Sequence, residues 1–147
     1  MRITQILIAI QIILLIVLNS CGHSEQKKST SKRLELTLNH GEKWKVDPPQ
    51  KQGMDSVYKL LATFKRGNIK KTVSDFNKLG TNLDKILSDI SQECRMEGKA
   101  KEEFLELISV LSEDVNQIKT TEDMAVAERY YQKTKDDYEN YFFFFEY

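Results

Sequence analysis

The residues best suited to chemistry in this chain of 147 residues are a cysteine and a methionine two positions apart, Cys94 and Met96. Thiolate and thioether sulfurs are soft ligands that favour cuprous copper. A stable copper or zinc site usually needs three or four converging ligands, and this pair supplies two. Cys94 also continues an apolar helix stripe, where cysteine behaves as a small buried hydrophobe. We predict that Cys94 belongs to the core and that metal binding is weak or absent. A soft-metal site that uses both sulfurs is the alternative.

Other groups that support catalysis are scarce. His23 and His40 have no serine or acid at a suggestive spacing, and the chain lacks a glycine-rich phosphate loop and a CxxC motif. The pair Glu102-Glu103 lies in a mixed-charge stretch typical of a solvated helix face. Residues 21–92 carry 14 basic and 8 acidic groups, but lack the interleaved aromatics of a nucleic-acid surface. We predict a protein that is not an enzyme, uses no cofactor and binds no nucleic acid.

Cys21 is the predicted site of lipid attachment. It follows an almost wholly aliphatic run from Ile6 to Leu18, and Leu18-Asn19-Ser20-Cys21 resembles the lipobox of bacterial lipoproteins. In that motif a signal peptide is removed before an acylated cysteine. We predict a signal peptide over residues 1–20, a lipid such as palmitate on Cys21, and membrane anchoring in the cell envelope, facing the periplasm or the surface. An uncleaved amino-terminal anchor is the alternative.

Aromatic residues gather at the carboxyl terminus. Five of the six tyrosines and four of the seven phenylalanines lie between Tyr130 and Tyr147. One helix face cannot bury so many rings, so two interpretations stay open. The rings either cover the bundle, or form an exposed patch for an envelope protein partner or a membrane interface. The candidate patch consists of Tyr141, Phe142, Phe143, Phe144, Phe145 and Tyr147.

These residues are expected to be positioned by helices. Apolar side chains recur at spacings of three and four through most of the chain, which predicts helices. Each helix has one apolar stripe to bury, and the connections are short, so we predict a mainly α fold, an antiparallel four-helix bundle. The predicted helices run from about Pro48 to Phe64, Ile69 to Cys94, Lys99 to Lys119 and Thr120 to Phe145. A capping box at Asp47 and Gln50 is predicted to start the first helix. Gly67-Asn68 is predicted to separate the first two helices, and Gly98 to end the second.

A small amino-terminal β-hairpin is predicted before the first helix. The stretches 34–38 and 44–46 alternate apolar and polar residues, and the turn formers Asn39-His40-Gly41-Glu42 lie between them. Two strands alone are marginally stable, so we expect the leucines and Trp44 to lie against the bundle. A ligand pocket is the alternative role for Trp44. The polar residues 21–33 form a flexible tether of about 40 Å at full stretch, which leaves 34–147 as the folded domain.

Two segments of the chain resemble a family of small bacterial lipoproteins of unassigned activity. Residues 36–47 are similar to the family's opening, of the form LTLNNG-KWK, and residues 94–100 to a later segment, of the form CTMKGEAHDQLH. The resemblance implies a lipoprotein with a helical domain, in which the cysteine, methionine and two histidines suggest a soft-metal site. Here the histidine positions hold Lys101 and Leu105, whereas Cys94, Met96, Gly98 and Ala100 are kept.

The sequence thus predicts a lipid-anchored helical bundle of the cell envelope that acts as a non-enzymatic binding or interaction module. The alternative function is a lipoprotein that binds or handles a copper-type soft metal through a degenerate site.

The anchoring prediction can be tested by replacing Cys21. Acyl chains contribute about 0.8 kcal/mol per buried methylene, so two or more chains hold a protein on a membrane. Cys21→Ser should therefore release the protein or leave it unprocessed, as judged by membrane fractionation and intact mass. Cys94→Ser serves as the control and should fractionate like the unchanged chain. A Cys21→Ser chain that is still mature and membrane-bound would contradict the lipobox interpretation.

Overall fold

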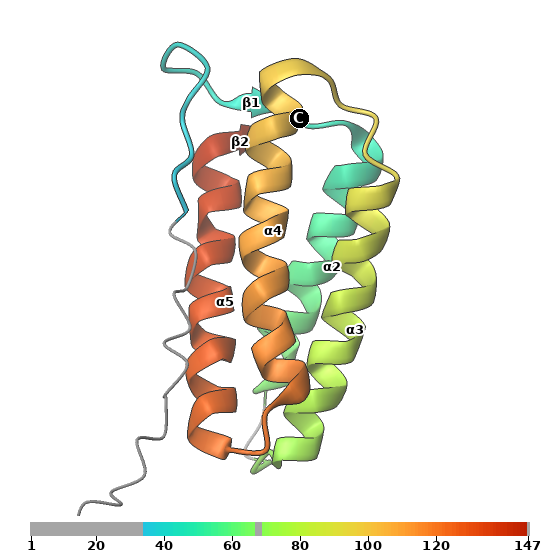
Figure 1. Cartoon of the computed structure of the whole chain (residues 1–147), viewed down its shortest axis with the longest axis vertical. Coiled ribbons are helices and arrows are strands. Elements are labelled where there is room, and N and C mark those ends of the chain that lie inside the picture. Colours follow the sequence, from blue (N-terminus) through green and yellow to red (C-terminus); the bar gives the residue numbers. More distant parts are fainter. Residues whose placement is uncertain (1–33, 67–68, 147) are drawn as a thin grey trace, which may run out of the picture. The chain divides into compact units, whose positions relative to one another are not determined.

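The computed structural model describes residues 34–66 and 69–146. Four helices make up most of this part of the chain: α2 (Pro48–Phe64), α3 (Val73–Gln92), α4 (Gly98–Thr120) and α5 (Met124–Phe144). Figure 1 shows them side by side along the long axis, with short connections at alternate ends, so that successive helices run in opposite directions. The prediction of a mainly α chain with four helices is confirmed. The predicted signal peptide, the tether, Cys21, Gly67-Asn68 and Tyr147 lie outside the described residues.

The predicted amino-terminal hairpin is wrong in its pairing. Its turn is present, because Asn39 and Glu42 exchange backbone hydrogen bonds around His40 and Gly41, both at positive φ. Residues 34–38, however, form no strand. Strand β1 (Trp44–Lys45) instead runs parallel to β2 (Phe145–Glu146), which follows α5. The segment just before α2 and the segment just after α5 therefore pair in a two-stranded parallel sheet, drawn at one end of the bundle in Figure 1.

Three predicted helix boundaries also need correction. Helix α3 begins at Val73, because Thr72 and Asp75 form a reciprocal capping box, and Ile69 is left 74% exposed outside the helix. The predicted capping box at α2 is absent, since Asp47 makes no side-chain cap and the Gln50 amide donates to the carbonyl of Glu93.

Gly98 is the first residue of α4, at a φ of +58°, and α3 already ends at Gln92. Glycine suits this left-handed conformation because it has no Cβ. Gly98 therefore opens α4 and does not end α3.

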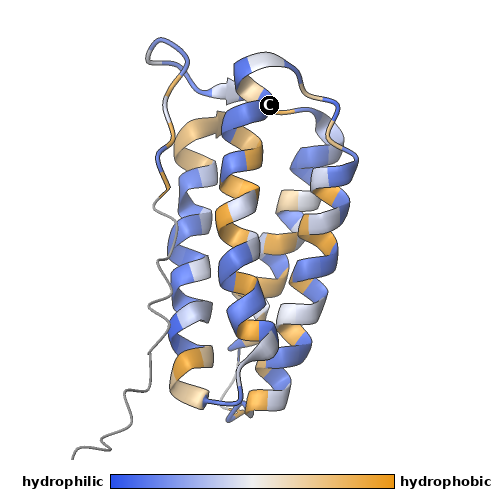
Figure 2. Cartoon of the chain, viewed as in Figure 1, coloured by the Kyte–Doolittle hydropathy of each residue, from blue (hydrophilic) through white to orange (hydrophobic). Residues whose placement is uncertain are grey.

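The core is built from the predicted apolar stripes. Leu83 and Leu87 of α3 and Phe104 and Leu111 of α4 are fully buried. Gly80 fills the one vacant slot in the α3 stripe, and a Cβ there would lie 2.6 Å from the backbone nitrogen of Lys119. The missing side chain lets α3 and α4 approach closely. Figure 2 shows hydrophobic and hydrophilic residues alternating along the helices, as expected for one buried face each.

One cluster of charged side chains is buried between α4 and α5. The Asp114 side chain is 2% exposed, and its carboxylate lies 2.8 Å from the Lys133 ammonium, which also pairs with Asp137. Burial raises the pKa of Asp114 to about 6 despite the opposing effect of Lys133, and Asp137 adds to the rise. Folding therefore makes Asp114 easier to protonate than it is in the unfolded chain.

This raised pKa predicts a pH-dependent contribution to stability. A carboxyl whose pKa is higher in the folded state contributes most below its unfolded pKa of 3.8, and that contribution is lost as pH rises through about 6. Asp114→Asn mimics the protonated acid, since its amide can donate to Asp137 and accept from Lys133. From pH 4 to pH 7 the free energy of unfolding of the variant, relative to the unchanged chain, should rise by about 1–3 kcal/mol.

Urea unfolding of both chains across this pH range, followed by circular dichroism, measures the difference. The matched control is Asp84→Asn, because Asp84 pairs with Lys119 at 41% exposure, far from the buried cluster. A difference for Asp114→Asn that does not change with pH would show that Asp114 does not titrate in this range.

Candidate functional site

A groove lies between α2 and α5, the first and last helices of the described chain. These two helices pack against each other less extensively than α3 does against α4 or α4 against α5. The groove has a volume of about 780 Å³. It is lined by Tyr58, Leu61 and Ala62 from α2 and by Lys135, Tyr138, Glu139, Phe142 and Phe143 from α5. Its lining is mainly apolar and aromatic, which is typical of binding sites.

Two buried tyrosine hydroxyls tie the helices that flank the groove. Tyr138 donates a hydrogen bond of 2.8 Å to the carbonyl of Met54, and Tyr131 donates one of 2.8 Å to the carbonyl of Leu61. Burial raises the pKa of both phenols, so each stays a protonated donor at neutral pH. The floor of the groove is thus held in one register across α2 and α5.

Three aromatic side chains around the groove are exposed to solvent. Tyr58, Phe142 and Phe143 are 52%, 51% and 61% exposed. Tyr58 stacks on the buried Tyr138 at a centroid distance of 6.0 Å, and Phe142 meets both rings edge to face. Tyr58, Tyr138 and Phe142 thus form one cluster, in which Tyr138 is buried and the other two rings are exposed; Phe143 lines the same groove and contacts Phe144. Such a contiguous apolar patch is a recognised mark of an interaction surface.

Some aromatic residues of the carboxyl terminus cover the bundle and others are exposed, so each of the two predicted roles applies to part of them. Tyr141 and Phe145 are buried and Phe144 is half-buried, whereas Phe142 and Phe143 are exposed. Within α5 the division follows helical spacing, because Tyr138 and Tyr141 continue the buried stripe and Phe142 and Phe143 do not. Phe145 is buried for another reason, since it lies in β2 and pairs with Trp44 of β1. Tyr58 was not among the predicted patch residues. Its signal was its position directly after the buried Val57, one step off the α2 stripe.

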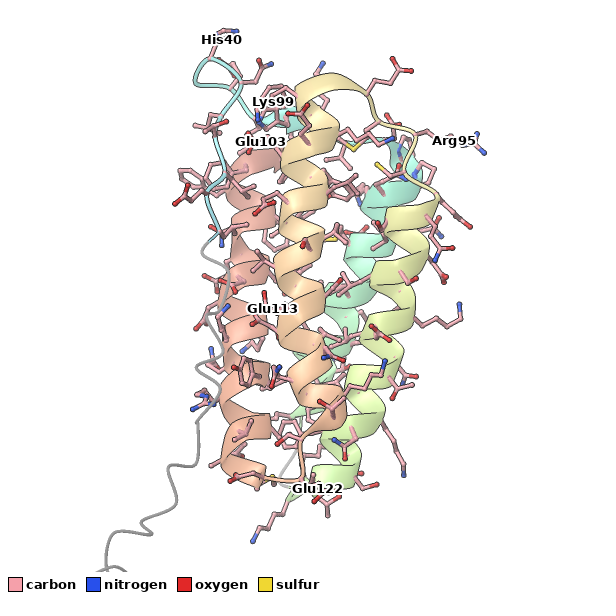
Figure 3. The ribbon with its side chains drawn as sticks, viewed as in Figure 1. His40, Arg95, Lys99, Glu103, Glu113 and Glu122 are labelled. Atoms are coloured by element: carbon pink, nitrogen blue, oxygen red, sulfur yellow. The ribbon has the colours of Figure 1, made fainter. Side chains whose placement is uncertain are left out.

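Cys94 and Met96 lie in the connection between α3 and α4. They are 9% and 5% exposed and belong to the hydrophobic core, whereas Arg95 between them points away from the bundle (Figure 3). Among the described residues no group of three or more His, Cys, Asp or Glu side chains is placed to hold a metal ion. The structure brings the two predicted sulfurs into the core without a third ligand of these types.

The prediction that Glu103 lies on a solvated helix face is wrong. It is 4% exposed rather than solvated, and it accepts hydrogen bonds from the backbone and side chain of Thr37 at 2.9 and 2.7 Å. The Lys99 ammonium lies 3.1 Å from a carboxylate oxygen of Glu103. Figure 3 labels both side chains near one end of α4. Burial by itself raises the pKa of Glu103, but these hydrogen bonds outweigh it and hold the pKa below its usual value. The carboxylate fastens the segment before β1 to α4.

Two further sequence-predicted residues lie at the same end of the bundle. His40 is exposed at the tip of the turn, far from other candidate groups (Figure 3). Trp44 is partly buried against the core, and its indole donates a hydrogen bond of 2.6 Å to the carbonyl of Thr37. Trp44 therefore packs against the core and does not line a ligand pocket.

No helix within residues 34–66 and 69–146 combines the length and hydropathy needed to cross a membrane. Comparison with known proteins finds no matching family model, no similar curated protein and no similar solved structure. The resemblance to small lipoproteins therefore stays a prediction that rests on two short segments.

The position of Cys94 predicts little affinity for soft metal. Titration of the folded chain with cuprous ions, in a Cys21→Ser background that leaves one thiol, should show no tight one-to-one complex, because two sulfurs are too few. The Cys94→Ser chain in the same background is the control and should titrate alike. Tight binding that the control loses would instead assign a soft-metal site to this connection.

Proposed function

We propose that the chain is a lipid-anchored, antiparallel four-helix bundle of the bacterial cell envelope that acts as a non-enzymatic interaction module. Its binding surface is the groove between α2 and α5. The observation that carries the proposal is the cluster of Tyr58, Phe142 and Phe143, each more than half exposed around a groove of about 780 Å³. Single exposed aromatics need no explanation, but several exposed rings that line one concave surface favour protein binding.

The chemistry of the groove favours binding over turnover. Its charged lining residues are Lys135 and Glu139, and the remaining lining is aromatic or aliphatic apart from the phenol groups. No nucleophile lies beside a base there. Two antiparallel helices with apolar residues between them offer a surface on which an apolar helix of a partner can lie.

The sequence before the folded domain supports the envelope location. The lipobox-like stretch ending at Cys21 predicts acylation, and residues 21–33 predict a tether of about 40 Å. Anchoring confines a protein to the membrane surface and raises its effective concentration toward partners held there. A modest groove affinity therefore suffices for docking.

A soft-metal-binding lipoprotein is the second candidate, and one observation favours it. Because α3 ends at Gln92, Cys94 and Met96 lie in a connection where both side chains face the core. On a continuous helix they would diverge by about 200°. Within residues 34–66 and 69–146 no group of three or more His, Cys, Asp or Glu side chains is placed to hold a metal ion, which keeps this function behind the interaction module.

The proposed docking can be tested with a photoreactive side chain in the intact envelope. Benzoylphenylalanine at Phe143 should form a covalent adduct on irradiation, whereas the same side chain at the exposed position Asn116 of α4 should not. Phe142→Ser should lower the yield at position 143 by about tenfold, since central aromatic contacts dominate interface energies. The melting temperature of Phe142→Ser, measured alongside, excludes unfolding as the cause. Equal adduct yields at 143 and 116 would contradict a docking role for the groove.

A further inference from the structure

We propose that the end of the bundle at the α2–α3 connection rests on an anionic lipid surface. This end lies opposite the β1–β2 sheet (Figure 1). The residues that make the contact are cations around one exposed isoleucine, called the basic tip: Lys65, Arg66, Ile69, Lys70 and Lys71. The contact adds a second surface to the proposed interaction module, and it rests on the proposed lipid anchor, which keeps the domain beside a membrane.

The α2–α3 connection carries an excess of positive charge. Residues 56–74 include five basic residues and no acidic one, although the whole chain has 22 of each kind. Arg66 and Lys70 are exposed, and neither side chain forms an ion pair within residues 34–66 and 69–146. Both cations are therefore available to anionic lipid headgroups, which attract Lys and Arg near a membrane surface.

The other two cations of the basic tip contact the bundle. The Lys65 ammonium lies 3.2 Å from a carboxylate oxygen of Glu128 on α5. The Lys71 ammonium lies 5.0 Å from the ring centroid of Phe64, the last residue of α2. These contacts hold the two sides of the connection against α5 and α2, so the free cations are presented from a fixed base.

Acidic side chains at the same end of the bundle are mostly occupied within the domain. Asp75 and Asp123 cap α3 and α5, and Glu128 pairs with Lys65. Glu122, which Figure 3 labels at this end, forms neither a cap nor an ion pair among the described residues. The single free carboxylate of Glu122 leaves the two free cations of the basic tip in excess.

Ile69 gives the basic tip an apolar centre. It is 74% exposed, more than Tyr58, Phe142 or Phe143, and it does not line the α2–α5 groove. At a membrane surface an apolar side chain enters the boundary of the acyl chains while the surrounding cations stay among the headgroups. An apolar residue among cations at the end of a bundle favours lipid over a protein partner, whose strongest contacts fill packed pockets.

The proposed tether is long enough for this contact. Residues 21–33 reach about 40 Å at full stretch. The longest helix of the described chain, α4, has 23 residues and spans about 35 Å. The basic tip can therefore reach the membrane that holds Cys21. Residues 21–33 also carry four basic groups and one acidic group, so the tether and the basic tip favour the same anionic surface.

An environment-sensitive fluorescent amino acid at position 69 tests the contact in the full chain. The chain is reconstituted by detergent removal into vesicles of phosphatidylcholine, alone or mixed with phosphatidylglycerol. In the mixed vesicles the emission at position 69 should shift to the blue and be quenched by a lipid-linked nitroxide. The same side chain at His40, exposed at the opposite end, should keep its aqueous emission.

Charge reversal at the basic tip should remove the contact. Arg66→Glu combined with Lys70→Glu should lower the ratio of bound to free tips by about tenfold or more, because four units of charge change near an anionic surface. The matched control is Lys45→Glu with Arg95→Glu, two exposed cations at the opposite end, which should leave the emission unchanged. Circular dichroism checks that both variants are folded.

Two comparisons test the lipid surface itself. Phosphate should weaken the contact no more than chloride at the same ionic strength, because a headgroup layer rather than one phosphate ion is bound. Preferential displacement by phosphate, or equal blue shifts on both kinds of vesicle, would overturn the proposal of an anionic lipid surface.

Flotation with phosphatidylcholine vesicles at high salt reports the anchor separately. A chain that floats with these vesicles, but keeps an aqueous emission at position 69 in the mixed vesicles, would overturn the basic tip and leave the anchored module standing. A chain that does not float, yet shows blue emission on the mixed vesicles, would overturn the anchor and leave the basic tip standing. Failure of both measurements would overturn both.

Discussion

Two buried tyrosine hydroxyls set the distance and register between the first and last helices, and the groove depends on them. Tyr131 and Tyr138 reach from α5 to the carbonyls of Leu61 and Met54. A phenol that bridges two helices keeps their backbones further apart than interdigitated aliphatic side chains do. The bundle is therefore closed by hydrogen bonds between α2 and α5, and the space beside those bonds is left for exposed rings. The tight contact at Gly80, between α3 and α4, is the opposite arrangement.

Buried polar groups elsewhere connect segments that apolar packing alone would leave loose. Glu103 fixes Thr37 to α4, and Lys133 joins two carboxylates between α4 and α5. Glu103 and Asp114 respond to acid in opposite directions. The pKa of Glu103 is lowered, so its contribution is lost as pH falls through that value, whereas Asp114 contributes most when protonated. Mild acid therefore favours the α4–α5 contact and leaves the Thr37 attachment intact until the pH is lower.

Local sequence patterns predicted the helices well and the long-range contacts poorly. Apolar spacing located all four helices, because each stripe is a local property of its own segment. The parallel pairing of Trp44 with Phe145 joins residues about a hundred positions apart, and no local pattern reports it. Ile69 matched the apolar spacing of α3, but the capping box at Thr72 overrides that match by starting the helix later.

The candidate site was predictable only in part for the same reason. Helical spacing from Tyr138 separates buried Tyr141 from exposed Phe142, and that information is present in the sequence. The burial of Phe145 depends on its pairing with Trp44, which the sequence does not report. Tyr58 joins the cluster only because α2 lies beside α5, which is a tertiary fact. Glu103 reads as solvated within its charged stretch, and its burial depends on Thr37, 66 positions earlier.

The way the chain enters α2 has a mechanical consequence. Between the amino-terminal side and α2, the chain is held first by the Thr37–Glu103 bonds and then by β1 against β2. A pull from the amino-terminal side is therefore borne by these hydrogen bonds before any force reaches the helices. Their rupture, rather than unravelling of the bundle, sets the load at which the domain first yields.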